Sequence, residues 1–253
     1  MKPVCLVIGA GAGIGGTVAA RFAREGYHAV LCRRSDGDGL AKLVDGIKAE
    51  GGEATGFLMN AIEPDTIEEQ VAHIEANIGP IEVAIYNLGA QIGNRALAET
   101  SEKAFEMGWR LGTLGLFRLA RVLCPIMEDR GGGKLLVTSA TSAMRGNAGQ
   151  HSHAAAMGGR RMLCQSLNAE FAPKGIHVAH IVIDGPVNAP DTLGKMLGAD
   201  RFVQLKETLG SKDGLLLPEH IAETYFHVAS QHRSVWTHEL DLRPYLDKPW
   251  WNG

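Results

Sequence analysis

Length, composition and charge indicate one globular domain and exclude several classes of protein. The chain has 253 residues, of which 45% are hydrophobic and 21% charged, enough apolar sequence for one large core. Its formal net charge of -3 provides no basic field for nucleic acids or anionic membranes. The first residues enter a strand pattern without the features of a signal peptide, and no apolar run reaches transmembrane length, so we expect a cytoplasmic protein.

The cysteine positions also favour a cytoplasmic protein. They are far apart, and each lies in an apolar run: Cys5, Cys32, Cys124 and Cys164. Isolated positions of this kind favour buried free thiols over a disulfide framework or a metal site. Free thiols are typical of a reducing environment.

Short runs rich in β-branched residues alternate with longer segments of helical periodicity. The strand-like runs cover residues 4–8, 28–32, 54–59, 83–86, 134–138 and 177–183. Strands that are apolar on both faces are buried only in a sheet with helices on each side. The sequence therefore predicts an α/β fold, a single Rossmann-type domain with a doubly wound parallel sheet.

The segments between and after these runs complete the alternation. Residues 101–127 carry apolar side chains at three- and four-residue spacing, which predicts one helix packed on the sheet and ending near Pro125. The pattern loosens over residues 184–214, and we expect 190–214 to form a mobile flap over the site. A helix over 218–230 and a last strand over 235–242 follow.

A glycine-rich loop, GAGAGIGG at residues 9–16, directly follows the first predicted strand. It fits two spacings, GxxxGxG at Gly9, Gly13 and Gly15, and GxGxxG at Gly11, Gly13 and Gly16. The first is favoured because Gly9 adjoins the strand. Glycines let the main chain approach a pyrophosphate closely. The helix expected to begin near Ile14 stabilises the charge of that pyrophosphate through its first N–H groups and its dipole. The loop predicts a bound dinucleotide; the alternative is a tight turn without a ligand.

The end of the second predicted strand indicates which dinucleotide binds. It reads LCRR at residues 31–34, with no acidic residue where a carboxylate would hold the ribose 2′-hydroxyl of NAD(H). Arg33 offers a guanidinium to a 2′-phosphate, so NADP(H) is favoured and NAD(H) is the alternative. In a second interpretation, Arg33 and Arg34 belong only to a solvated turn.

Further motifs follow the loop in a recognisable order. Residues 86–89 read YNLG, residues 184–187 read DGPV, and residues 236–244 read WTHELDLRP. Together with the loop they resemble the short-chain dehydrogenase/reductase family, in which an NNAG motif, a PG motif and a C-terminal strand stand at these places. The resemblance covers the whole chain.

The resemblance implies a set of cofactor contacts and an assembly. Asn60, with Ala61 beside it, stands where the family has an Asp that contacts adenine. Asn87 and Gly89 are expected to lie along the cofactor, and the main chain near Val187 is expected to meet the nicotinamide carboxamide. Relatives are commonly dimers or tetramers, so we expect a homo-oligomer that pairs the helices over 101–127 and 153–171.

The family's catalytic residues do not carry over. Where the family has YxxxK, this chain has His153 and Met157, and Gly112 stands in place of the helix Asn. The serine position falls within residues 139–142, where Ser139 and Thr141 flank Ala140. The roles of Asn, Tyr and Lys are therefore altered.

His153 can still exchange protons without the lysine. A phenol needs help because its unperturbed pKa is about 10, whereas the pKa of imidazole is about 6.5. An ammonium at residue 157 would repel a protonated imidazole, so a neutral Met157 is compatible with a working histidine. In the alternative, the pocket has relaxed, His153 is an ordinary polar residue and Met157 fills space. Either Arg160 or Arg161 could reach back toward the site, although two arginines on a helix more often face solvent or a subunit interface.

We interpret the chain as an NADP(H)-dependent oxidoreductase acting on a carbonyl or alcohol group of a small molecule. His153 would exchange the proton, and Ser139 or Thr141 would bind the substrate oxygen. One alternative is a dinucleotide-binding sensor or partner subunit without hydride transfer, and another is non-redox chemistry in the same pocket. No metal site is predicted, because residues two apart on a helix, such as His151 and His153, point away from each other. Residues 191–214 and the pair Trp250–Trp251 are expected to shape the substrate pocket.

Overall fold

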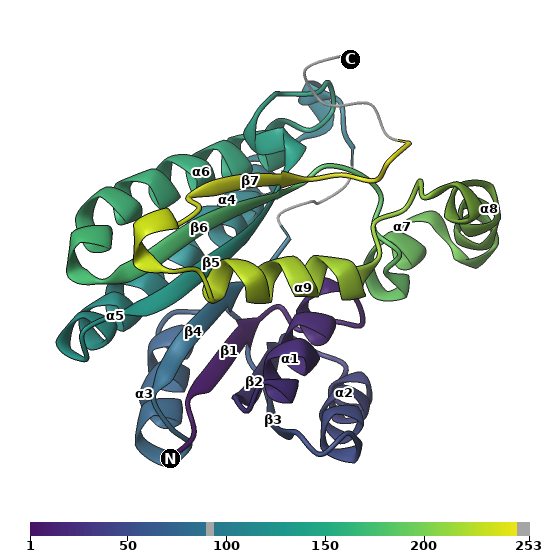
Figure 1. Cartoon of the computed structure of the whole chain (residues 1–253). Helices are drawn as coiled ribbons and strands as arrows, with labels where there is room; N and C mark the ends of the chain where they lie inside the picture. Colours follow the sequence, from purple (N-terminus) through teal and green to yellow (C-terminus); the bar gives the residue numbers. More distant parts are fainter. Residues whose placement is uncertain (90–93, 247–253) are drawn as a thin grey trace.

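Seven parallel strands form one sheet in the order β3-β2-β1-β4-β5-β6-β7 (Figure 1). The computed structural model describes residues 1–89 and 94–246, so Trp250 and Trp251 lie outside the described residues. The strands are β1 (Val4–Ile8), β2 (His28–Arg33), β3 (Glu53–Leu58), β4 (Ile81–Tyr86), β5 (Gly133–Ala140), β6 (Ile176–Ile183) and β7 (Glu239–Leu242). The first six predicted strands are confirmed: β1 has the predicted bounds, and no end of the other five is shifted by more than two residues.

Helices cover both faces of the sheet, as the two-sided apolar strands predict. The α-helices are α1 (Ile14–Arg24), α2 (Gly37–Ala49), α3 (Thr66–Asn77), α4 (Glu102–Trp109), α5 (Gly115–Asp129), α6 (His151–Phe171), α7 (Lys195–Leu197), α8 (Ala199–Leu209) and α9 (Pro218–Ala229). Buried side chains of α1, α2 and α9 pack on one face, and those of α3, α5 and α6 pack on the other. The doubly wound Rossmann-type fold is therefore confirmed.

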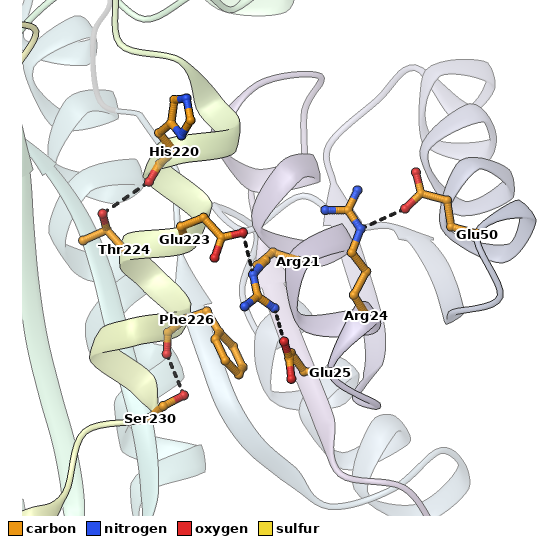
Figure 2. A network of polar contacts seen from close by, with 9 residues as sticks. All are labelled: Arg21, Arg24, Glu25, Glu50, His220, Glu223, Thr224, Phe226 and Ser230. Atoms are coloured by element: carbon orange, nitrogen blue, oxygen red, sulfur yellow. Dashed lines mark hydrogen bonds and ion pairs between the residues drawn. The ribbon is translucent and has the colours of Figure 1, made fainter.

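Polar contacts join the outer surfaces of the helices on the first face (Figure 2). The Arg21 guanidinium of α1 donates to Glu223 of α9 at 2.8 Å and lies 4.1 Å from the centre of the Phe226 ring. Arg24 donates to Glu50, at the end of α2, at 3.0 Å. Exposed ion pairs contribute little individually, so packing of the buried stripes holds these helices.

The helix predicted over 101–127 differs from the prediction in two ways. A π-helical turn, Arg110–Leu114, interrupts it between α4 and α5. It also continues past Pro125 to Asp129. Leu123 and Met127 on either side of the proline are buried against the sheet, and this packing outweighs the one lost helical hydrogen bond.

The C-terminal third corrects the start of one strand and shows the secondary structure of the expected flap. The strand expected over 235–242 begins only at Glu239, because Arg233–Val235 form a 3-10 turn and Trp236 stacks on His177 with ring centres 4.8 Å apart. The flap expected over 190–214 is largely helical: it contains a π-helical turn, Pro190–Gly194, followed by α7 and α8. These helices project at the right of Figure 1, beyond the sheet.

Two further findings concern composition. All four cysteines are buried and free, as their apolar surroundings predict, and burial raises the pKa of Cys32 and Cys164 to about 12. Within the described ranges, no helix combines the length and apolarity that a membrane span requires.

Candidate active site

A cavity of about 310 Å³ opens at the carboxyl ends of the central strands. Its walls come from the glycine loop after β1, the ends of β4, β5 and β6, and the first turns of α6. The chain runs outward in opposite directions from β1 and β4, and this switch point is where α/β sheets bind ligands. The topology therefore places the cavity where the fold forms a natural crevice.

The glycine loop forms one wall and depends on main-chain contacts that a side chain would block. Gly9 has φ +99°, a conformation that favours glycine, and the Asn87 side chain donates to its carbonyl oxygen at 2.9 Å. A Cβ on Gly15 would lie 2.3 Å from that same oxygen. Gly13, Ile14, Gly89 and Val187 also line the cavity.

A carboxylate from the flap already lies on this loop. The Ala12 N–H donates to Asp191 Oδ2 at 3.1 Å, and the guanidinium of Arg33 lies 3.5 Å from the same oxygen. Lys195 lies 3.4 Å from the other oxygen. The Ala12 hydrogen bond, with help from the two cations, holds the pKa of Asp191 below its ordinary value. An anion is thus stabilised where the loop was predicted to bind one.

Three residues expected near the adenine half, Asn60, Ala61 and Arg33, are not among those that line the cavity. Asn60 and Ala61 follow β3, where the Asn60 amide donates to Glu63 at 3.1 Å. Arg33 lies at the end of β2 and contacts Asp36 at 3.0 Å as well as Asp191. Its Nη1 is buried and makes no hydrogen bond to the described residues.

The wall formed by α6 carries His153 and Met157. Buried positions on this helix recur at 153, 157, 160, 164, 167 and 171, the spacing of one face packed on the sheet. His153 is 9% exposed and lines the cavity. Met157 lines it too, with its sulfur 4.0 Å from the Ser139 hydroxyl.

Thr141 is directed elsewhere. Its hydroxyl donates to the buried carboxylate of Asp184 at 2.6 Å, and it is not among the residues that line the cavity. The structure therefore brings Ser139 and His153 to one cavity and places Thr141 outside it.

Arg160 takes the less common of its two expected positions. It does not face solvent: it is 1% exposed and lines the cavity. Its N–H groups donate to the carbonyl oxygens of Gly112, Thr138, Leu88 and Leu111. Its place in the spacing 153, 157, 160 was a signal that could have found it. Arg161 instead pairs with Glu239 through two hydrogen bonds of 2.7 and 2.8 Å.

Comparison with known proteins gives relatives along most of the chain. The chain is 30% identical over 232 residues to the short-chain reductase protein NovJ of Streptomyces niveus, covering 90% of this chain and 87% of that protein. It is 26% identical over 239 residues to the 3-oxoacyl-[acyl-carrier-protein] reductase FabG of Thermotoga maritima, covering 94% of each.

A solved structure and a family model agree with these relatives. A short-chain dehydrogenase from Rhodopseudomonas palustris superposes with a TM-score of 0.81 at 32% identity, covering 97% of this chain and 100% of that one. The family model described as short chain dehydrogenase matches residues 3–192. The chain therefore belongs to the short-chain dehydrogenase family.

Proposed function

We propose that the chain is an NADP(H)-dependent oxidoreductase that acts on a carbonyl or alcohol group. The observation that carries the proposal is that one cavity joins the glycine loop to His153 and Ser139. Two relatives are named as reductases, one of them a 3-oxoacyl-[acyl-carrier-protein] reductase, which supports redox chemistry at a carbonyl group.

The residues at the loop fit a phosphorylated nucleotide. The Asp191 carboxylate bonds to the Ala12 N–H and approaches Arg33, so the main chain and the guanidinium already stabilise an anion. Nη1 of Arg33, without a hydrogen bond to the described residues, is a buried donor suited to a 2′-phosphate. When bound, a nicotinamide nucleotide donates or accepts the hydride.

His153 and Ser139 perform the remaining chemistry in this proposal. In this proposal the imidazole of His153 gives a proton to the carbonyl oxygen during reduction and takes it back during oxidation. The Ser139 hydroxyl donates a hydrogen bond to the same oxygen and stabilises the charge that develops there. We assign this second role to Ser139 and not to Thr141, because Asp184 holds the Thr141 hydroxyl.

His153→Ala is expected to lower kcat about a hundredfold or more while nucleotide binding changes little, because a general acid contributes to the reaction and not to phosphate binding. Stopped-flow absorbance at 340 nm with a panel of carbonyl compounds measures the rate. His151→Ala is a matched control, since His151 is two residues away and lies outside the cavity wall.

Nucleotide titration, together with product analysis of the same reactions by mass spectrometry, separates the alternative functions. If the wild-type protein binds nucleotide but converts no substrate, it acts as a dinucleotide-binding sensor or partner subunit. Conversion of a substrate without any nicotinamide nucleotide would instead point to elimination or hydrolysis in this cavity.

The cofactor preference rests on Arg33. Arg33→Ala is expected to weaken NADPH binding about tenfold and to leave NADH binding unchanged, because only NADPH carries the 2′-phosphate. Isothermal titration with both nucleotides measures this difference, and Arg34→Ala, at an exposed neighbouring position, is the control. Equal losses for NADPH and NADH would contradict the preference for NADP(H).

Self-association stays a prediction and belongs to this proposal. Phe105 and Trp109 on α4 and Phe117 on α5 are 44%, 43% and 45% exposed, which leaves aromatic surface for a partner to cover. A second copy of the chain that pairs along these helices would cover them. Light scattering that finds only single chains would contradict it.

A further inference from the structure

Arg160 places a buried positive charge at the wall of the cavity. No carboxylate pairs with it among the described residues; its partners are main-chain carbonyl oxygens. Burial lowers the pKa of the Arg160 guanidinium, but a guanidinium is basic enough to stay protonated inside proteins. Carbonyl dipoles offset only part of a buried charge, so the cavity keeps a positive potential beside Arg160.

The partners of Arg160 adjoin the candidate site residues. Leu88, which accepts at 2.7 Å, lies between Asn87 and Gly89, and Thr138, which accepts at 2.5 Å, precedes Ser139. Gly112, which accepts at 2.6 Å, belongs to the π-helical turn, a rare element that is frequent at functional sites. One side chain therefore connects the ends of β4 and β5 to the turn between α4 and α5.

One donor of Arg160 remains for a ligand. A guanidinium has five N–H groups, and Arg160 makes four hydrogen bonds with the described residues. Because helical side chains lean toward the N-terminus of their helix, Arg160 covers the turn that carries Met157. Both residues line the cavity.

The position of Arg160 indicates which half of a bound dinucleotide its side chain can contact. Arg33 lies at the end of β2, and Arg160 is bonded to residues of β5 and the segment after β4. The strand order separates β2 from β5 by three strand spacings, about 14 Å. A dinucleotide whose 2′-phosphate reaches Arg33 therefore extends its nicotinamide half toward Arg160.

We propose that Arg160 is a ligand-positioning residue that binds the nicotinamide-ribose half of the nucleotide through its charge and its remaining N–H group. It supplies the cation that the neutral Met157 does not. This inference rests on the dinucleotide binding proposed above. The competing explanation is that Arg160 only holds the main chain of the cavity wall in place.

Two substitutions separate charge from hydrogen bonding. Arg160→Gln keeps an N–H donor for the carbonyl oxygens but removes the charge, and Arg160→Lys keeps the charge but loses the planar fork. Arg161→Met is the matched control, because Arg161 is adjacent on α6 but bonded to Glu239. Thermal unfolding and circular dichroism establish that each variant is folded.

Binding of two probes tests the proposal by isothermal titration. NADPH contains both halves of the nucleotide, whereas 2′,5′-ADP contains only the adenosine half with its 2′-phosphate. Arg160→Gln is expected to weaken NADPH binding about tenfold and to leave 2′,5′-ADP binding within about twofold of wild type. Arg160→Lys is expected to recover most of the lost NADPH affinity, and Arg161→Met to change neither.

The outcomes that overturn the proposal are distinct. Equal weakening of both probes in Arg160→Gln would show a structural role only, and unchanged NADPH binding would show no role toward the ligand. If Arg160→Gln does not fold, Arg160→Met, which also removes the charge, takes its place and is judged by the same two outcomes. A wild-type protein that binds neither probe would instead refute the proposed function itself.

Discussion

Gly15→Ala is expected to abolish measurable nucleotide binding and to destabilise the protein by about 1–3 kcal/mol. The new Cβ would lie 2.3 Å from the Gly9 carbonyl oxygen and 2.9 Å from the Ala10 Cα. Both atoms are main chain in a loop that Asn87 also holds, so the loop itself must shift. Because the loop N–H groups bind phosphate through their positions, a shifted loop loses the anion.

Gly46→Ala is the matched control for this prediction. Gly46 lies in the last turn of α2, and a Cβ there would meet nothing within 4 Å. Alanine favours the helix by about 0.5–1 kcal/mol over glycine, so this variant is expected to be slightly more stable than wild type and to bind normally. Urea unfolding and NADPH titration of both variants check the pair. Normal NADPH binding by Gly15→Ala would show that the loop does not hold the pyrophosphate.

Much of the fold could be predicted because the features that determine it, apolar strands and glycine spacing, can be read within short segments of the sequence. The strands are apolar on both faces, which only a sheet between two helical layers explains, and the glycine spacing identifies the turn after β1. The shortened β7 is different: Trp236 leaves the strand to stack on His177, a residue far away in the sequence. Contacts of that kind leave no periodic pattern in either segment.

In the candidate site, too, some residues could be predicted from the sequence, whereas others depend on contacts between distant segments. His153 and Ser139 could be assigned to one cavity from the order of motifs, whereas the Thr141 hydroxyl bonds to Asp184, 43 residues away. The burial of Arg160 depends on carbonyl groups from three separate segments. Asp191 reaches the glycine loop across 179 residues. Such partners become visible only when the chain is folded.

His180 is expected to make the protein markedly less stable in mild acid. Its side chain is fully buried in β6, and its Nδ1 lies 3.0 Å from the Glu239 carboxylate, which Arg161 already binds. Burial lowers the pKa of His180 to about 4, despite the opposing attraction of Glu239. In the unfolded chain the pKa of histidine is about 6.5.

The sign of the effect follows from these two pKa values. Between pH 6.5 and 4 the unfolded chain binds a proton at His180 and the folded protein does not, so the free energy of unfolding falls as the pH falls through this window. At pH 5 the loss is about 2 kcal/mol relative to pH 8, since one pKa unit is worth about 1.4 kcal/mol. Above pH 6.5 and below pH 4, His180 adds no further pH dependence.

Urea unfolding at pH 8 and pH 5, for wild type and His180→Gln, measures this contribution. Other groups titrate in both proteins, so the difference between their pH dependences belongs to residue 180, and the glutamine variant should lose about 2 kcal/mol less on acidification. His220→Gln, at an exposed position of α9, should behave like wild type. An equal loss of unfolding free energy in wild type and His180→Gln would contradict this prediction. It would show that the imidazole binds its proton as readily in the folded protein as in the unfolded chain, because Glu239 compensates for the burial of the charge.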